Sequence, residues 1–160
     1  EIYNRYYKAM YNTLLRIVRD SYRAEDIMQE SFLIAFSKLE SLKDTSVFGA
    51  WLKRIVVNNS IADYNKTAKE NTIALNDVLY KVEDTAIGLD EDDLQKDKIS
   101  YILKAIKQLK SNYSLSLTLH LIEGYDYEEI SEIMNISQGN CRTLISRAKE
   151  SLRQKLSISA

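Results

Sequence analysis

Apolar residues recur every three or four positions through the first 68 residues, which is the period of an amphipathic helix. The pattern predicts helices over about 2–19, 23–40 and 47–68. In the second of these, the apolar stripe consists of Met28, Phe32, Ala35, Phe36 and Leu39. Three helices with one apolar face each can bury a shared core, so this part of the chain predicts a small helical domain.

Helical periodicity returns at Ile99 and leads to a second pattern near the end of the chain. Asn135 and Ile136 interrupt it, and Ser137 is a candidate N-cap, because its hydroxyl can accept a hydrogen bond from an amide two or three residues on. The helix that follows has an apolar stripe of Cys141, Leu144, Ile145, Ala148 and Leu152. A helix, a short turn and a second helix together form a helix-turn-helix unit.

One stretch conflicts with this all-helical picture. Residues 114–121 read SLSLTLHL, an alternation with the period of two that is typical of a half-buried strand. A lone strand would leave both of its edges unpaired, and no other segment offers a partner with matching alternation. Wound as a helix, the same leucines form a broad apolar face, so a helix that supports the helix-turn-helix is the better prediction.

Composition supports the same fold class. The 160 residues contain no proline and four glycines, whereas strand-and-turn proteins need both at their turns. The net charge of −1 is unevenly distributed: residues 1–70 carry 11 basic and 9 acidic side chains, residues 71–100 carry 3 and 8, and residues 101–160 carry 8 and 6. We therefore predict two small all-α domains, 1–69 and 98–160, joined by a mostly irregular acidic linker over 70–97.

Other features of the chain set its expected cellular context. The lone Cys141 excludes an internal disulfide and suits a reducing cytoplasm. No apolar run reaches the roughly 20 residues of a membrane span, and no secretory signal is visible. Because the chain begins at Glu1 without a methionine, native residues are expected to precede it.

Three groups of polar residues are candidates for function. On the second helix, Asp26, Gln29, Glu30 and Leu33 lie opposite the apolar stripe, on a face that is either an acidic docking face or an ordinary solvated one. A hydrolytic pair of Asp26 and Glu30 is a third possibility, but it lacks a nucleophile or metal-ligand companion. The only histidine, His120, is far away in the sequence and is expected at the surface or its boundary.

The third helix offers basic and amide groups beside an aromatic residue. Lys53, Arg54 and Asn58 lie around Trp51, an arrangement suited to stacking on unpaired bases and to contact with phosphates. The alternative is that Trp51 belongs to the core.

The third group lies on the second helix of the helix-turn-helix. The residues off its apolar stripe are Gln138, Asn140, Arg142, Thr143, Ser146 and Arg147. The N-terminal part of such a helix enters the major groove, where Gln and Asn can pair with adenine and Arg with guanine. A solvated surface is the alternative. Cys141 lies on the apolar side and is expected in the core rather than as a redox sensor.

Three stretches, in this order and spacing, resemble the extracytoplasmic-function sigma factors, small two-domain bacterial initiation factors of the sigma-70 family. They are AEDIMQESF (24–32), FGAWLKRIVVNNSIADY (48–64) and YDYEEISEIMNISQGNCRTLISRAKESL (125–152). The resemblance covers nearly the whole chain except the linker. It implies a DNA-binding protein that is not an enzyme and that has no cofactor, metal or small-molecule substrate.

The resemblance also implies a role for each domain. Residues 1–69 would correspond to region two, with Asp26, Gln29 and Glu30 on the β′ clamp helices of core RNA polymerase. The loop 40–47, including Lys43, would capture a flipped base of the −10 element, and Lys53, Arg54, Asn58 and Asp63 would handle the melted strand. Residues 98–160 would correspond to region four, which reads the −35 element with 138–147 and contacts the β flap. An anti-sigma factor would control the protein.

The chain departs from the family pattern at several positions. Lys110 stands where the family has proline, and Asn112, Ser114 and His120 stand where it has arginines. Fewer phosphate contacts are expected as a result. The alternative to an initiation factor is therefore a sigma-like adaptor or decoy that binds polymerase or an anti-sigma factor without reading DNA.

Overall fold

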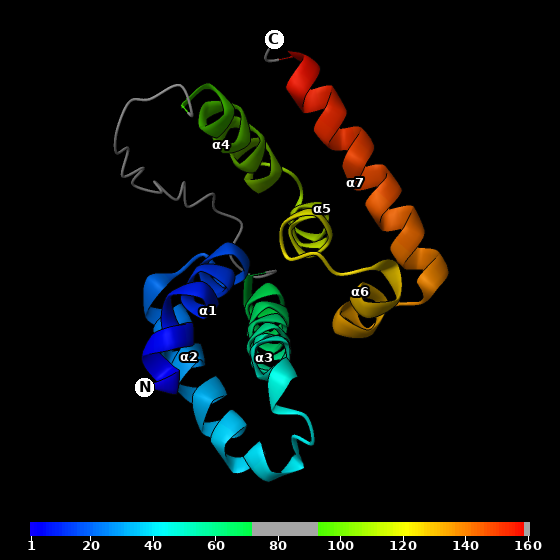
Figure 1. Ribbon diagram of the computed structural model, residues 1–160. Helices are drawn as coiled ribbons and strands as arrows, with labels where there is room; N and C mark the ends of the chain where they lie inside the picture. The colour runs from blue at the N-terminus through cyan, green and yellow to red at the C-terminus, as the bar shows by residue number, and fades with distance from the viewer. Residues whose placement is uncertain (72–92, 159–160) are drawn as a thin grey trace. The chain divides into compact units, whose positions relative to one another are not determined.

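The computed structural model describes residues 1–71 and 93–158, and all regular structure within these ranges is helical (Figure 1). The chain separates into two compact units, Glu1–Ala74 and Leu75–Ala160. Seven α-helices lie in the described ranges, three in the first unit and four in the second. The predicted all-α class with two small helical domains is confirmed.

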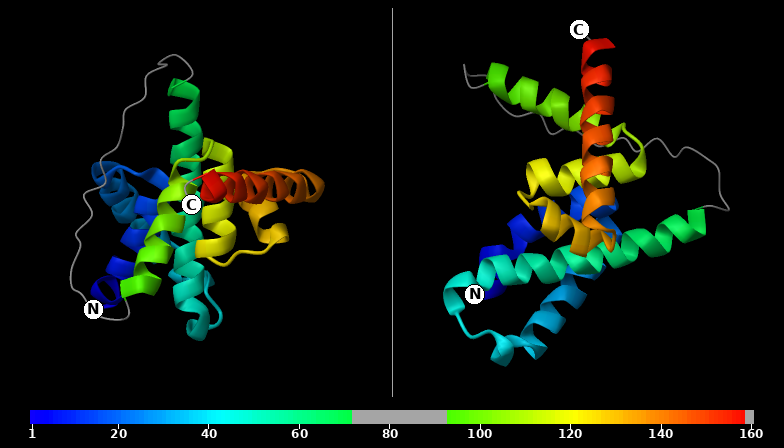
Figure 2. Two further views of the ribbon diagram at one scale, coloured as in Figure 1. Left: turned by 90° about the horizontal axis from the view of Figure 1, so that it is seen from above. Right: turned by 90° about the vertical axis from the view of Figure 1, so that its right-hand side faces the viewer.

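The first unit consists of α1 (Ile2–Val18), α2 (Ser21–Ser37) and α3 (Phe48–Asn71). Arg19 ends α1 in the left-handed conformation, at φ 59° and ψ 26°, and the chain reverses there. Asp20 then caps α2, because its carboxylate accepts hydrogen bonds from the amides of Tyr22 and Arg23 at 3.0 and 3.2 Å. The right-hand view of Figure 2 shows α3 as one long uninterrupted helix.

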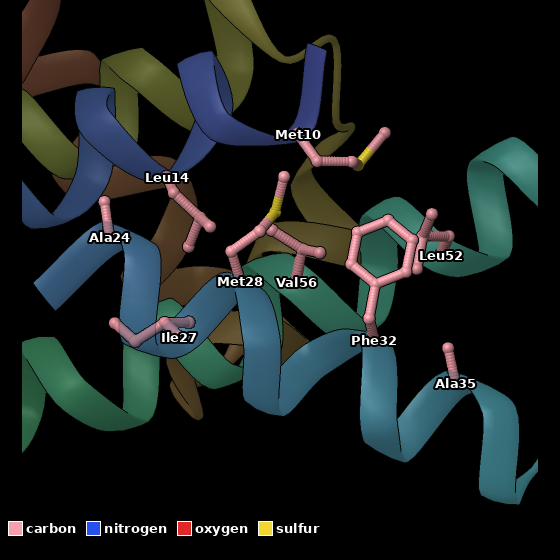
Figure 3. Close-up of a cluster of buried hydrophobic side chains, with 9 residues drawn as sticks. All are labelled: Met10, Leu14, Ala24, Ile27, Met28, Phe32, Ala35, Leu52 and Val56. Carbon is pink, nitrogen blue, oxygen red and sulfur yellow. The ribbon is translucent and has the colours of Figure 1, made fainter. Parts of the chain in front are cut away.

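These three helices share one apolar core, as predicted. Figure 3 shows how its side chains converge, with Met28 and Phe32 of α2 directed toward Val56 and Leu52 of α3. The cluster consists of Met10, Leu14, Ala24, Ile27, Met28, Phe32, Ala35, Leu52 and Val56. Burial of this apolar surface is the main stabilising contribution in the unit.

The predicted apolar stripe of α2 is wrong at its C-terminal end. Phe36 is 51% exposed and Leu39 is 40% exposed. The reason is geometric: the buried row follows Ala24, Met28, Phe32 and Ala35, and Phe36 lies beside that row. The helix ends at Ser37, so Leu39 no longer belongs to its face.

Both ends of the predicted linker differ from the prediction. Helix α3 continues to Asn71, and α4 begins at Asp93, so the first and last residues of the range 70–97 are helical rather than irregular. Residues 72–92 lie outside the described residues.

The second unit contains α4 (Asp93–Lys107), α5 (Ser111–Leu117), α6 (Tyr127–Met134) and α7 (Gln138–Ile158). Helix α5 packs against α4 and α7, and α6 packs against α7. A π-helical turn, Thr118–Ile122, continues directly from α5. It is closed by the amide of Glu123, which donates to the carbonyl of Thr118 at 3.0 Å.

The strand-like stretch 114–121 is therefore helical, as the context predicted. All six residues from Ser114 to Leu119 are buried, so the helix is surrounded on every side and needs no polar face. Its hydroxyl groups bond to the backbone of their own helix: Ser116 donates to the carbonyl of Tyr113 at 3.0 Å, and Thr118 to that of Ser114 at 2.7 Å. Serine and threonine can thus alternate with leucine inside a core, because their hydroxyl groups form hydrogen bonds with their own helix.

Candidate nucleic-acid interface

The helix-turn-helix is held by hydrogen bonds at both ends of its first helix. Asp126 caps α6 by accepting from the amide of Glu129 at 2.8 Å, and Glu129 accepts in return from the amide of Asp126 at 2.9 Å. At the other end, Asn135 adopts the left-handed conformation at φ 54°, and the amide of Ile136 donates to the carbonyl of Ser131 at 3.0 Å. The turn direction is therefore fixed by local bonds.

Ser137 caps the second helix, as the sequence predicts. Its hydroxyl accepts a hydrogen bond from the amide of Asn140 at 3.1 Å. Figure 1 shows α6 joined to the start of α7 through this short turn. The cap leaves the first turns of α7 well defined, which is where a recognition helix makes its base contacts.

The polar face of α7 is exposed along its whole predicted length. The exposed residues are the six predicted ones, Gln138, Asn140, Arg142, Thr143, Ser146 and Arg147. The apolar stripe is buried at Cys141, Ile145, Ala148 and Leu152 and half-buried at Leu144. The structure thus brings two amides and two guanidinium groups to one accessible helix face, while the opposite face holds the helix on the second unit.

Cys141 is fully buried in this stripe, as predicted for a core residue. Burial raises the pKa of its thiol, and the nearby positive charge of Arg142 partly opposes that effect. A buried, protonated thiol is a poor nucleophile, so Cys141 contributes packing rather than redox chemistry.

His120 lies at the boundary of the second unit, half-buried as predicted. Its Nδ1 lies 2.8 Å from the carbonyl oxygen of Tyr125, and its ring centroid lies 5.0 Å from that of Tyr127. These contacts tie the π-helical turn to the start of α6.

In the first unit, the outer face of α2 combines acidic and apolar side chains. Asp26, Gln29 and Glu30 are exposed, as expected for a docking face. On the same face, Tyr22 is 83% exposed and Leu33 is 71% exposed. Leu33 was predicted on this face, whereas Tyr22 was missed by the sequence analysis, although the spacing 22, 26, 29, 33 places it in the same row. We call the set Tyr22, Asp26, Gln29, Glu30 and Leu33 the α2 surface. Large apolar groups without a cover are typical of interaction sites.

The loop between α2 and α3 is open to solvent. Within 40–47 only Leu42 is half-buried, and Lys43 is exposed with the rest. Asp44 orders the end of this loop, because its carboxylate accepts hydrogen bonds from the amide and the hydroxyl of Ser46 at 2.9 and 2.7 Å. These bonds lower the pKa of Asp44. The loop presents polar groups from a defined turn at the N-terminus of α3.

The predicted residues of α3 occupy different environments. Asn58 is exposed, and Lys53 and Arg54 are half-buried. Trp51 is also half-buried and packs on the core cluster, with its ring centroid 5.8 Å from that of Phe48. The indole thus belongs to the core on one side and keeps part of its surface accessible, and base stacking by Trp51 stays a prediction.

Asp63 has a partner that the sequence analysis did not predict. Its carboxylate forms an ion pair with the guanidinium group of Arg23 on α2, and the same nitrogen of Arg23 donates to the hydroxyl of Thr67. The two charged side chains are 33% and 25% exposed. One turn earlier on α3, Asn59 donates to the hydroxyl of Ser31 at 3.0 Å.

Family models identify both units. The model "Sigma-70 region 2" matches residues 2–70, and "Sigma-70, region 4" matches residues 99–152. The ECF RNA polymerase sigma factor SigM of Bacillus subtilis is 30% identical over 154 residues, which cover 96% of this chain and 91% of that protein. The chain belongs to the ECF sigma factors. The ECF sigma-E factor of Haemophilus influenzae is 31% identical over 138 residues, or 82% of this chain and 73% of that protein.

A solved structure shares the fold of this ECF sigma factor. It is the sigma factor RpoE of Bartonella quintana in complex with the anti-sigma factor NepR, with a TM-score of 0.63 and 20% sequence identity over 99% of this chain and 96% of that one. The match shows that the two proteins share a fold.

Family membership also decides among the candidate chemistries. ECF sigma factors are transcription factors and not enzymes, so the hydrolytic pair of Asp26 and Glu30 is set aside. Among the described residues, no group of three or more His, Cys, Asp or Glu side chains could hold a metal ion. The described helices include none that is long and apolar enough to cross a membrane.

Proposed function

We propose that this ECF sigma factor binds core RNA polymerase and directs it to specific promoters, with one DNA contact from each unit. The observation that carries the proposal is the exposed polar face of α7 on a fully capped helix-turn-helix. A face that offers amides and guanidinium groups from a rigid helix suits sequence reading in the major groove.

In this proposal α7 reads the −35 element. Gln138 and Asn140 in its first turn, followed by Arg142, Thr143, Ser146 and Arg147, supply the base contacts. Arg153 lies further along the helix, beyond the residues that would enter the groove, where we expect a phosphate contact; it also pairs with Glu150 at 2.8 Å. Ser114 stands where the family has arginine, and at 1% exposure it would supply no phosphate contact.

The first unit handles the melted −10 element. The exposed loop 40–47, with Lys43, would hold a base flipped out of the duplex. Trp51, Lys53, Arg54 and Asn58 on α3 would hold the single strand by stacking and by phosphate contacts. Asp63 would stand at the end of this surface. Opening of the duplex needs no fuel, because capture of unstacked bases offsets the few kcal/mol that unpairing costs.

The α2 surface docks the protein on polymerase. Its acidic residues Asp26 and Glu30 would meet basic groups on the β′ clamp helices, and Leu33 would supply an apolar centre. The second unit would contact the β flap, and an anti-sigma factor would sequester the protein, as NepR binds the sigma factor of Bartonella quintana. A factor that works on core polymerase acts in the cytoplasm.

The first experiment combines the protein with core polymerase from its own host and fragmented genomic DNA, and sequences the RNA that is initiated. Discrete start sites with shared motifs about 10 and 35 bases upstream are the expected result. If polymerase binds the protein but no start site is enriched over core alone, the adaptor hypothesis takes its place.

A matched pair of arginine variants tests base reading by α7. Arg142→Ala should weaken binding to the preferred −35 sequence by about 1–3 kcal/mol and relax specificity at one position. Arg153→Ala should weaken binding to all sequences alike, because a phosphate contact carries no sequence information. Equal effects of Arg142→Ala on every sequence would contradict direct reading.

A further inference from the structure

Arg23 makes an unusual set of contacts for a residue in the first turn of α2. Its Nη2 donates to the carboxylate of Asp63, to the hydroxyl of Thr67 and, at 3.5 Å, to the backbone carbonyl of Asp63. The partners lie 40 and 44 positions away in sequence, in the C-terminal half of α3. Because both side chains are mostly shielded from water, this ion pair is stronger than a pair on an open surface.

A second polar contact joins the same two helices. Asn59 of α3 donates to the hydroxyl of Ser31, which is completely buried. The same helices also meet through apolar side chains such as Met28 and Val56. Apolar contacts are not directional and tolerate sliding, whereas hydrogen bonds have narrow geometry. The two polar contacts therefore fix the position of α3 along α2.

The two helices carry different parts of the proposed function. Asp26, three positions after Arg23, belongs to the α2 surface that would dock on polymerase. Asn58, next to Asn59, belongs to the part of α3 that would hold the melted strand. The hydrogen bonds of Arg23 and Asn59 thus set the distance between the α2 surface and the part of α3 that would hold the melted strand.

We propose that Arg23 is a positioning residue for promoter opening: through Asp63 and Thr67 it holds α3 at one place on α2. It also neutralises Asp63, whose negative charge would otherwise face a nucleic-acid strand. Loss of Arg23 both releases α3 and exposes that charge. This inference rests on the proposed function, since it concerns the step that follows polymerase binding.

The test uses the full chain on core polymerase and a promoter found with the wild-type protein. Arg23→Ala should leave the affinity for core polymerase within about twofold and reduce open-complex formation on duplex DNA by roughly tenfold, the effect expected for one charge-assisted hydrogen bond. Permanganate reactivity of unpaired thymines measures the opening. Arg5→Ala is the matched control, because it also removes an arginine from the first unit, but one that is exposed on α1. The guanidinium carbon of Arg5 lies 5.9 Å from the ring centroid of Tyr6 on the same helix.

Three further variants separate positioning from simple loss of stability. Arg23→Lys keeps the charge but loses the planar fork, so it should fold and give an intermediate opening defect. The exchange Arg23→Asp with Asp63→Arg should recover most of the opening, because the pair is restored with its ends reversed. Asp63→Ala on the Arg23→Ala background should add no further loss.

The outcomes distinguish this inference from the proposed function. Equal losses of polymerase affinity and opening in Arg23→Ala, or wild-type opening in that variant, would overturn the positioning role while leaving the initiation factor intact. Failure of the charge exchange, with Asp63→Ala more harmful than Arg23→Ala, would overturn it in favour of a direct strand contact by Asp63. Failure of the wild-type protein to open any promoter would contradict both the proposed function and the positioning role of Arg23.

Discussion

Asp126 and Glu129 hold the first turn of α6 by exchanging hydrogen bonds, each carboxylate accepting from the other residue's amide at 2.8 and 2.9 Å. Two amides that have no partner within the helix are satisfied in this way. The pair also fixes where α6 starts relative to the π-helical turn before it, since only Glu123, Gly124 and Tyr125 separate the turn from the cap.

Removal of this cap should destabilise the second unit. Asp126→Ala is expected to lower the free energy of unfolding by about 1 kcal/mol, the usual cost of losing a side-chain N-cap. Glu128→Ala is the control, because Glu128 is exposed in the same turn but makes no part of the cap, and it should lose only a few tenths of a kcal/mol. Urea unfolding followed by circular dichroism measures both. Equal losses in the two variants would show that charge, not capping, holds the turn.

Substitution by alanine at two glycine positions should change the free energy of unfolding in opposite directions. Gly124 has φ +79°, a left-handed conformation that a side chain disfavours, so Gly124→Ala should cost about 1 kcal/mol or more. Gly139 lies in the first turn of α7, and an added Cβ there would meet no heavy atom within 4 Å. Gly139→Ala should therefore gain up to about 1 kcal/mol from helix propensity. Thermal unfolding of the two variants side by side tests the contrast, and a stabilised Gly124→Ala would contradict it.

The buried thiol of Cys141 should make stability depend on pH. Burial raises its pKa, so the folded state keeps the proton longer than the unfolded state does. This contribution to stability is complete below the unfolded pKa of about 8.5 and is lost progressively as the pH rises above it. Cys141→Val, which keeps the apolar volume, should remove this part of the pH dependence and change stability at neutral pH by less than about 1.5 kcal/mol.

Thiol titration with a chromogenic disulfide reagent checks the same burial. Native protein should react slowly and denatured protein at once. The thiolate is the reactive species, and burial in the native protein disfavours ionisation of the thiol. Fast reaction of the native protein at neutral pH would contradict the buried position of Cys141.

Sequence reasoning predicted the elements whose cause is local or periodic. The stripe of Cys141, Ile145 and Leu152 and the cap of Ser137 follow from helical spacing and from the chemistry of one hydroxyl, and both are present in the structure. In the stretch 114–121, the period of two indicated a strand, whereas the neighbouring helical segments indicated a helix. Its alternation arises because a helix buried on all sides admits serine and threonine, provided that their hydroxyls bond to the helix itself.

The features that sequence reasoning missed depend on distant partners. The ion pair of Arg23 with Asp63 joins positions 40 residues apart, and no periodicity in one sequence links them. The left-handed Arg19 carries no glycine or asparagine signal, and the π-helical turn adds a residue that leaves no compositional trace. The exposure of Tyr22 was missed although it was readable, because Tyr22 lies four positions before Asp26 on the polar face where Leu33 was predicted.

That exposed leucine gives the sharpest test of polymerase docking. Leu33 is 71% exposed, so Leu33→Ala should leave the free energy of unfolding unchanged within about 0.5 kcal/mol. Its affinity for core polymerase should nevertheless fall by roughly tenfold, because a leucine buried on binding contributes 1.5 kcal/mol or more. Equilibrium binding of labelled protein to core polymerase measures the change.

A neighbouring residue of α2 provides the control for this experiment. Glu25 is exposed but lies near Tyr3 of α1, where burial and the charges of Tyr7 and Glu25 raise the pKa of the Tyr3 hydroxyl. Glu25→Gln should therefore bind polymerase like the wild-type protein. If Leu33→Ala also binds with wild-type affinity, the α2 surface is not the docking site, and polymerase contacts this sigma factor elsewhere.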